Sequence, residues 1–289
     1  MGGSVKSLPA KCDLPAGLLM WAGSLEHTKQ TRAMGMCMRV GRVPYLHTEP
    51  FYFDMARRGI ELHEMVPSAL VTAAEAGDID AGPVPLADCF HLEDRFQPVG
   101  GFCVASVKQA VSILLFSTVP MTELGGVQIG VTDEASSPPR LLQVLLRLKY
   151  RVEPKAFVSL DAAEAAFLLI GNQALRQRIG TPGFAYTYDL GAEWRAWTGL
   201  PWVFSRWMVR KDLDPKDRAL LEDTLYVGLE EGVNALYGLA DPREDLLMLP
   251  RDIVTYIQGL RYYIGHAEQQ AIERFRHYLN ELDANEFGA

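Results

Sequence analysis

Residues 38–85 read MRVGRVPYLHTEPFYFDMARRGIELHEMVPSALVTAAEAGDIDAGPVP, and this stretch decides the fold class. Three short apolar runs alternate in it with two segments of helical period. Pro67 and Gly77 bracket the second of these segments as helix start and stop signals. The order strand, helix, strand, helix, strand predicts a parallel sheet with right-handed crossovers. The expected strands are Met38–Val43, Ile60–Val66 and Ile79–Val84, and the expected helices are Glu49–Arg58 and Pro67–Ala76.

A second series of strands and helices follows the breakers Val119-Pro120 and Gly125-Gly126. The chain beyond Pro215 has helical periods throughout. We therefore predict an α/β protein of two lobes, hinged around a ligand, with a helical C-terminal tail packed on the first lobe. Lobe 1 is expected to hold residues 38–117 and 206–289, and lobe 2 residues 118–205. Two strands, Gln109–Phe116 and Pro201–Val209, are expected to cross between the lobes, and Gln97–Ala105 is a further strand of the first.

Composition excludes several classes of protein. The 289 residues carry 36 acidic and 28 basic side chains, a net charge of −8, and no run of Lys or Arg typical of a nucleic-acid binder. No apolar run approaches the roughly 20 residues of a membrane helix. The four cysteines form no CxxC pair and are too few for a disulfide scaffold. We expect a cytoplasmic protein with neither a nucleic-acid nor a membrane partner, and the sequence leaves its oligomeric state open.

Residues 1–37 differ from the rest because they lack clear periodicity. We expect an N-terminal extension that is disordered or reflects a misassigned start. The apolar stretch Leu14–Leu25 is a poor signal-peptide core because Pro15 and Gly17 interrupt it. The cluster Met34–Met38 fits a set of closely spaced translation starts better than a soft-metal site.

Ligands of open α/β sheets bind beyond the carboxyl ends of the strands, where helix N-termini also offer free N–H groups. Four such junctions stand out, two from each half of the chain, and a cleft between lobes could collect all of them. They are residues 44–48, 82–85, 132–138 and 171–172.

The junctions supply three candidate side chains. Ser136 and Ser137 precede Pro138, so either they hold an anion with the free amides behind them, or Ser137 simply caps its helix. His47 is the one histidine at a junction, and it is either a general acid or base or a packing residue. The other five histidines show no metal-ligand spacing.

Three more polar residues interrupt apolar or aromatic segments. Ser112 lies in an apolar strand and either satisfies a backbone group or faces a cleft. Arg206 shares a face with Trp202 and Phe204 by strand alternation, so it either grips a carboxylate or forms a salt bridge. Asp189 is expected to cap the helix that follows it.

Several strings resemble one known family. They are GRVPYLHTEP (41–50), GDIDAGPV (77–84), SILLFS (112–117), LIGNQAL (169–175), YDLGAEW (188–194), WTGLPWVF (197–204) and YIG (263–265). The fifth and sixth are the most specific. From about Met38 to Asp283 the chain resembles the chorismate dehydratases of the futalosine route to menaquinone, which have the two-lobed fold of type II periplasmic binding proteins.

The resemblance implies a lyase without a cofactor or metal, which removes water from chorismate to give 3-(1-carboxyvinyloxy)benzoate. Ser112 matches the family's active-site serine, and His47 stands where the family has an asparagine of the substrate site. The sequence departs from the family pattern also at Ser136–Pro139, Asn172 and Arg206. We expect Ser112 and His47 to be catalytic, and the substrate, a small carboxylate, to contact Tyr45, Thr48, Ser136, Ser137, Asn172 and Arg206.

Two alternatives remain open. The bilobal fold also serves solute-binding or sensing proteins, which close on a small carboxylate without chemistry. The departures at His47 and Arg206 are compatible with a diverged lyase that acts on a related anion.

Overall fold

The structure is a computed structural model that describes residues 37–239 and 241–286. Nearly all of the expected N-terminal extension, including the apolar stretch Leu14–Leu25, lies outside these residues. The described chain from Cys37 onward forms one compact unit. No helix of the described residues is long and apolar enough to cross a membrane.

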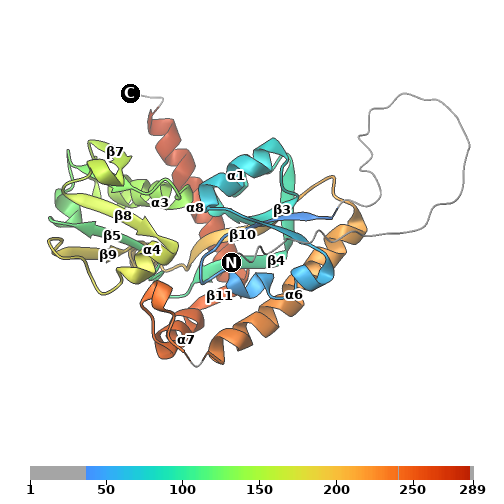
Figure 1. Cartoon of the computed structure of the whole chain (residues 1–289). Coiled ribbons are helices and arrows are strands. Elements are labelled where there is room, and N and C mark those ends of the chain that lie inside the picture. The colour runs from blue at the N-terminus through green and yellow to red at the C-terminus, as the bar shows by residue number, and fades with distance from the viewer. Residues whose placement is uncertain (1–36, 240, 287–289) are drawn as a thin grey trace, which may run out of the picture. The chain divides into compact units, whose positions relative to one another are not determined.

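The first half of the chain builds most of one mixed sheet of six strands, called here the first sheet (Figure 1). The strand order is β11-β4-β10-β3-β1-β2. β1 pairs in parallel with β2 and β3, as the opening stretch predicts, whereas β10 and β11 run antiparallel to their partners. The bounds are β1 Arg39–Arg42, β2 Glu61–Glu64, β3 Ala81–Pro85, β4 Phe96–Ser106, β10 Trp202–Arg210 and β11 Leu260–Tyr263.

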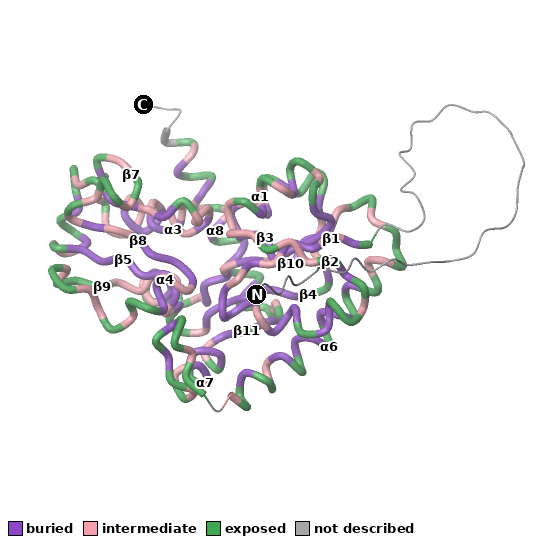
Figure 2. The backbone as a smooth tube through the Cα atoms, in the orientation of Figure 1, coloured by how far each residue is buried: buried purple, intermediate pink, exposed green. Residues whose placement is uncertain are grey.

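The middle of the chain forms a second sheet of five strands in the order β7-β6-β8-β5-β9. β6 pairs in parallel with β7 and β8, and β5 pairs antiparallel with β8 and β9. Figure 2 shows that β5 and β8 are buried along most of their length. The bounds are β5 Ile113–Ser117, β6 Gln128–Val131, β7 Ala156–Ser159, β8 Ala166–Ile170 and β9 Tyr186–Asp189.

The crossings between the sheets lie before β5 and before β10. β5 belongs wholly to the second sheet and β10 wholly to the first. The expected placement of residues 113–117 in the first lobe and of residues 202–205 in the second is therefore wrong at the level of strand pairing. The physical reason is that both strands begin at a crossing, where the hydrophobic pattern does not indicate which sheet receives them. The division into two lobes at residues 117 and 205 is otherwise untested and stays a prediction.

Helices cover the sheets, and one predicted helix is replaced by tighter turns. The prediction for α1 is confirmed, because it spans Pro67–Ala76 and ends at Gly77 with φ 78°. Residues 49–58 instead form two 3-10 turns, Glu49–Tyr52 and Ala56–Arg58. Consecutive burial of Phe51 and Tyr52 needs more than one face of an α-helix, so packing overrides local preference. The remaining helices are α2 Leu86–His91, α3 Ser137–Val144, α4 Gly171–Arg176, α5 Leu190–Thr198, α6 Pro215–Tyr237, α7 Pro250–Gln258 and α8 His266–Glu286, and a π-helical turn, Leu145–Tyr150, extends α3.

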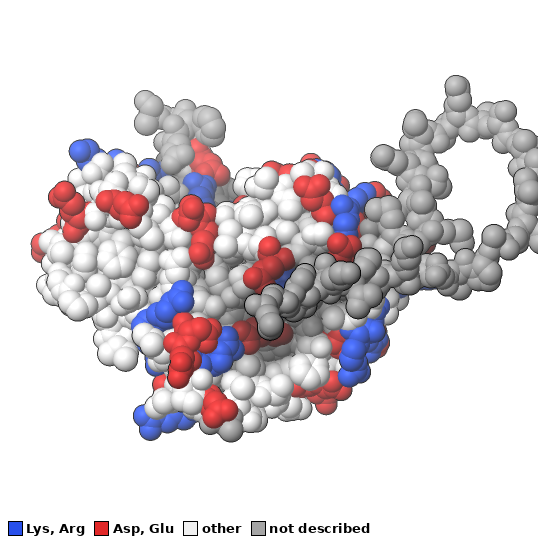
Figure 3. Space-filling model, viewed as in Figure 1, with Lys and Arg blue, Asp and Glu red and all other residues white. Residues whose placement is uncertain are grey.

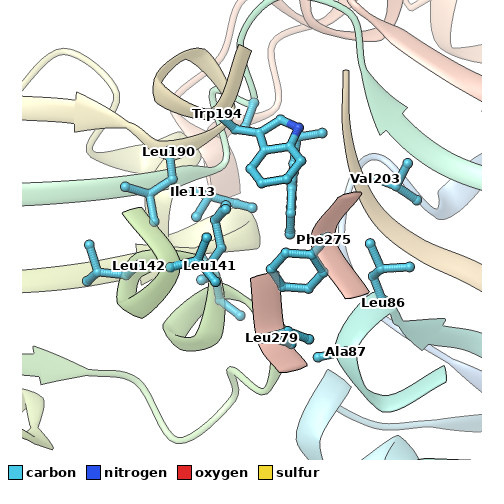
Figure 4. Close-up of a cluster of buried hydrophobic side chains, with 14 of the residues drawn as sticks. Leu86, Ala87, Ile113, Leu141, Leu142, Leu190, Trp194, Val203, Phe275 and Leu279 are labelled. Carbon is cyan, nitrogen blue, oxygen red and sulfur yellow. The ribbon is translucent and has the colours of Figure 1, made fainter. Parts of the chain in front are cut away.

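The C-terminal helix α8 packs on elements of both sheets rather than on the first lobe alone. It contacts β10 of the first sheet and α2, the helix that follows β3 of that sheet. It also contacts α3, the helix that follows β6 of the second sheet. Phe275 of α8 is fully buried, and its ring lies 6.0 Å from that of Trp194 and 4.9 Å from that of Trp202. Figure 4 shows Phe275 among side chains from α2, α3, α5 and β10, so one continuous core spans the two sheets.

The surface is mixed in charge. On the face shown in Figure 3, acidic and basic side chains are interspersed, with large uncharged areas between them. Several charged side chains of the described residues form ion pairs, such as Arg243–Glu49 at 3.1 Å and Arg178–Asp252 at 3.1 Å.

Candidate functional site

A small cavity lies where the four predicted junctions meet. Its volume is about 60 Å³, and its walls come from both sheets. Each of the four junctions contributes to the lining, and β10 adds Phe204 and Ser205. The lining residues are Val43, Tyr45, His47, Thr48, Pro67, Pro83, Pro85, Ser112, Ile113, Pro138, Ile170, Gly171, Phe204 and Ser205. Because these residues are mostly apolar, the few polar groups among them determine its chemistry.

Three side chains are joined by hydrogen bonds at the site, and two of them, His47 and Ser112, line the cavity. The Tyr256 hydroxyl donates to Ser112 Oγ at 2.9 Å, and it lies 3.0 Å from His47 Nδ1. Ser112 is 1% exposed, Tyr256 4% and His47 6%, so this chain of polar groups is shielded from bulk water. The structure therefore brings together the two residues expected to be catalytic and joins them through a third.

His47 is held in an aromatic environment that keeps it neutral. Its ring stacks on Phe204 with centroids 5.4 Å apart, and Tyr45 lies on another side at 5.6 Å. Burial lowers the pKa of His47 to about 4. A neutral imidazole at physiological pH can accept a proton, which a charged one cannot.

Ser112 owes its position to the turn that precedes β5. The Asp189 carboxylate accepts hydrogen bonds from the N–H groups of Ala110 at 2.9 Å and Val111 at 2.6 Å. Val111 has φ 60°, an unfavourable conformation for a β-branched residue. Asp189 also accepts from Ala192 N at 2.9 Å, which confirms the predicted helix cap. A single carboxylate thus caps α5 and stabilises the strained turn that presents Ser112.

Two polar bridges join the sheets beside the cavity. The Tyr45 hydroxyl donates to Glu134 Oε2 at 2.5 Å, and Gln173 Nε2 donates to the other oxygen of Glu134 at 2.8 Å. Asn172 accepts from Leu46 N at 3.1 Å and donates to the Pro44 carbonyl at 2.9 Å. Burial, with Glu134 adding to it, raises the pKa of Tyr45 above its usual range. Both bridges link residues 44–46 to residues that follow strands of the second sheet, Glu134 after β6 and Asn172 after β8. We call these two bridges the seam.

Ser137 also joins the two halves rather than capping its own helix. Ser136 is the residue before α3, and Ser137 Oγ instead accepts from Ala87 N at 2.8 Å, at the start of α2. The interpretation of Ser137 as the cap of α3 is therefore wrong, because the neighbouring helix competes for its hydroxyl. Pro138 and Pro139 also lack N–H groups, which leaves few free amides for an anion at this end of α3.

Of the remaining candidates, Thr48 lines the cavity and Ser136 does not. Thr48 Oγ1 lies 2.7 Å from the Val43 carbonyl and 2.8 Å from that of Tyr45, so it shapes the turn after β1. Ser136 lies beside Asp88, away from the lining. Burial raises the pKa of Asp88, and the Ser136 hydroxyl opposes that rise.

Arg206 does not line the cavity, contrary to strand alternation. The ladder between β10 and β4 shifts register between Val203 and Ser205, so Phe204 and Ser205 both reach the lining. The charge of Arg206 acts instead on the thiols of Cys89 and Cys103, and it opposes the burial that raises both pKa values to about 12. A bulge of this kind leaves no clear signal in the sequence.

Tyr256, Glu134 and Gln173 were missed by sequence reasoning. Tyr256 is separated from His47 by 209 residues, and nothing in the pattern of α7 marks it. Glu134 lies inside the predicted junction 132–138. An acidic side chain there, with Tyr45 in the junction 44–48, was the feature of the sequence that could have indicated the contact.

A second, larger hollow of about 780 Å³ is lined in part by Tyr256. Its walls include Lys108, Arg178 and Arg261. The two arginines are already paired, Arg178 with Asp252 at 3.1 Å and Arg261 with Glu268 at 3.7 Å. We assign the functional site to the smaller cavity because the strand ends, the seam and the Ser112 turn all converge there. Among the described residues, no group of three or more His, Cys, Asp or Glu could hold a metal ion.

Comparison with solved structures defines the class of fold. The chain is similar to an alkanesulfonate-binding protein of Xanthomonas axonopodis pv. citri, with a TM-score of 0.60, 12% identity and coverage of 88% of this chain and 95% of that one. It is also similar to a Candida albicans protein described as having the generic periplasmic-binding-protein fold, with a TM-score of 0.53, 10% identity and coverage of 86% and 90%. The chain therefore has the periplasmic-binding-protein-like fold that its sequence predicts.

Sequence comparison defines the family. The chain belongs to the menaquinone biosynthesis family, whose model matches residues 38–281. It is 23% identical over 260 residues to the chorismate dehydratase of Thermus thermophilus, and the match covers 83% of this chain and 94% of the relative. The resemblance inferred from the sequence strings is thereby confirmed at the level of the family.

The seam depends on the absence of a side chain at Gly171. A Cβ atom there would lie 2.5 Å from Tyr45 Cζ, and the residue has φ 54°. Gly199 has φ 73° with nothing within 4 Å, so it shares the backbone penalty but not the clash. We expect Gly199→Ala to reduce the free energy of unfolding by about 1–2 kcal/mol, and Gly171→Ala by a further 1–3 kcal/mol or so from overpacking. Urea denaturation of both variants checks this, and equal losses would contradict the close contact.

Burial of neutral His47 makes stability depend on pH. The pKa rises from about 4 in the folded protein to about 6.5 in the unfolded chain, so the unfolded state binds more protons between these values. The stability contributed by this residue is therefore complete above pH 6.5 and falls by about 3 kcal/mol as the pH drops to 4. His47→Asn removes this pH-dependent part of the free energy of unfolding, because asparagine does not titrate in this range. Denaturation across pH 4–8 should show a steeper acid loss in the wild type than in the variant, and parallel curves would refute the burial.

Proposed function

We propose that the chain is a lyase that removes water from chorismate to give 3-(1-carboxyvinyloxy)benzoate. The observation that carries the proposal is the buried chain Ser112–Tyr256–His47 beside the cavity, in a family member similar to a chorismate dehydratase along most of its length. The reaction requires loss of a ring proton and of the neighbouring hydroxyl group, and formation of the aromatic ring supplies much of the driving force.

The cavity suits this chemistry because it is largely apolar and has a neutral base. His47 accepts the ring proton, and Ser112 orients the substrate by hydrogen bonding. The departing hydroxyl leaves as water once it gains a proton, which His47 can return. The apolar walls exclude solvent, so these few hydrogen bonds act in a medium of low dielectric constant.

The substrate can enter only if the seam opens. The cavity volume of about 60 Å³ is well below the roughly 300 Å³ or more of ordinary small-molecule pockets. The bridges that close it, Tyr45–Glu134 and Asn172–Leu46, are polar, and water can replace them when the sheets separate. We infer that the described conformation corresponds to a closed state without room for chorismate, and that opening precedes binding.

The test is direct turnover of chorismate by the purified chain, followed by chromatography and mass spectrometry. We expect the enolpyruvyl benzoate as product. His47→Asn should lower kcat by roughly 10²–10⁴-fold, the usual contribution of a general acid–base group. His63→Asn is the matched control, since His63 pairs with Glu61 at 3.0 Å and does not line the cavity. Ser112→Ala should weaken both binding and turnover.

Absence of product with the wild-type chain would contradict the proposal. Thermal stabilisation by chorismate without turnover would indicate a binding protein. Turnover that is unchanged in His47→Asn would remove His47 from the chemistry and leave Ser112 as the candidate that remains.

A further inference from the structure

The Tyr256 hydroxyl occupies a position that the proposed reaction does not yet use. It comes from α7, far from both partners in sequence, and it bridges Ser112 Oγ at 2.9 Å and His47 Nδ1 at 3.0 Å. The ring is 4% exposed. A buried hydroxyl that joins the two candidate catalytic residues constrains which of their atoms carry protons. The catalytic meaning of this constraint rests on the proposed function.

The hydrogen-bond acceptors in the series Ser112–Tyr256–His47 indicate which atom carries each proton. The Ser112 hydroxyl donates to the Ala110 carbonyl at 3.3 Å, so Ser112 Oγ receives the proton of Tyr256. The tyrosine oxygen can then only accept from His47, whose Nδ1 must carry hydrogen. In a neutral imidazole, this leaves the lone pair on Nε2.

Tyr256 is suited to fixing this arrangement rather than to exchanging protons. Burial raises the pKa of its hydroxyl above the usual value, so the group stays neutral at working pH. α7 holds it in place, because Asp252 accepts a hydrogen bond from Leu249 N at 3.2 Å and pairs with Arg178 at 3.1 Å. The ring also forms part of the wall of the larger hollow, so a change that keeps the ring and removes the hydroxyl leaves that wall in place.

We propose that Tyr256 is a positioning residue whose hydroxyl holds His47 in the Nδ1–H tautomer and directs the basic Nε2 atom toward the substrate. The residue does not contact the reacting atoms. Its role resembles that of the acidic group of a catalytic triad, which fixes the tautomer of the histidine that carries out proton transfer.

Tyr256→Phe tests the proposal because it keeps the ring and removes only the hydroxyl. Tyr262→Phe is the matched control, since Tyr262 is 8% exposed, lies on the adjacent strand β11, and its hydroxyl has no hydrogen-bond partner among the described residues. We expect kcat for chorismate to fall roughly 10- to 100-fold in Tyr256→Phe with little change in KM, in the range typical of outer partners of a functional histidine. Tyr262→Phe should retain wild-type kcat and KM.

The tautomer itself gives a readout independent of activity. Long-range nitrogen–proton NMR spectra of the full chain distinguish Nδ1–H from Nε2–H, and His47→Asn identifies the His47 signals by their loss. We expect Nδ1–H in the wild type and in Tyr262→Phe, and a shift toward Nε2–H in Tyr256→Phe. The wild-type spectrum alone tests the assignment, even if Tyr256→Phe does not fold.

The outcomes separate this inference from the proposed function. If the wild type does not turn over chorismate but shows the expected tautomers, the proposed function fails while the role of Tyr256 in holding His47 is supported. A wild-type His47 protonated on Nε2 would overturn the inference, whatever the activity. Unchanged kcat in Tyr256→Phe, alongside an active wild type, would overturn it as well.

Discussion

The Asp189 carboxylate binds the turn between the two sheets, and the rest of the site depends on that interaction. It accepts the N–H groups of Ala110 and Val111, one of which lies in a conformation that costs about 1–3 kcal/mol. Without this anion, two partly buried donors would lack this partner and the turn would relax. Ser112 would then move away from Tyr256, and Tyr256 would lose the acceptor that determines how it binds His47.

Two kinds of contact connect the halves of the molecule, and they differ in how readily they can separate. Around Phe275 and Trp194 the contact is a continuous apolar core, which loses its stabilisation when water enters. At the seam the contacts are hydrogen bonds of Tyr45 and Asn172, whose groups water can satisfy. The polar contacts therefore lose less free energy on exposure to water than the apolar core does, so the opening that we propose for substrate entry would occur at the seam. Burial beside the seam lowers the pKa of His47, which keeps its imidazole neutral at physiological pH.

The sequence predicts the elements better than it predicts the site. Strand and helix patterns identify β1–β3, α1 and the four junctions because periodicity and start signals are local properties. The helix expected at residues 49–58 fails because burial of Phe51 and Tyr52 is a tertiary requirement. Ser112 and His47 lie at the cavity as expected, whereas Arg206 does not, because a bulge in β10 breaks the alternation on which its placement relied. Tyr256 could not be predicted, since its role arises only when α7 packs beside residues far away in sequence.

The central claim is that a small carboxylate binds in the cavity between the sheets, beside Ser112 and His47. Hydrogen–deuterium exchange of the full chain, with and without chorismate, tests it most directly, because it locates binding without requiring turnover. The account predicts that chorismate slows exchange in residues 43–48, 110–113 and 170–173, which surround the cavity and its seam. Protection confined to residues 252–261, with no change in the other three segments, would place the ligand in the larger hollow that Tyr256 lines and contradict the account.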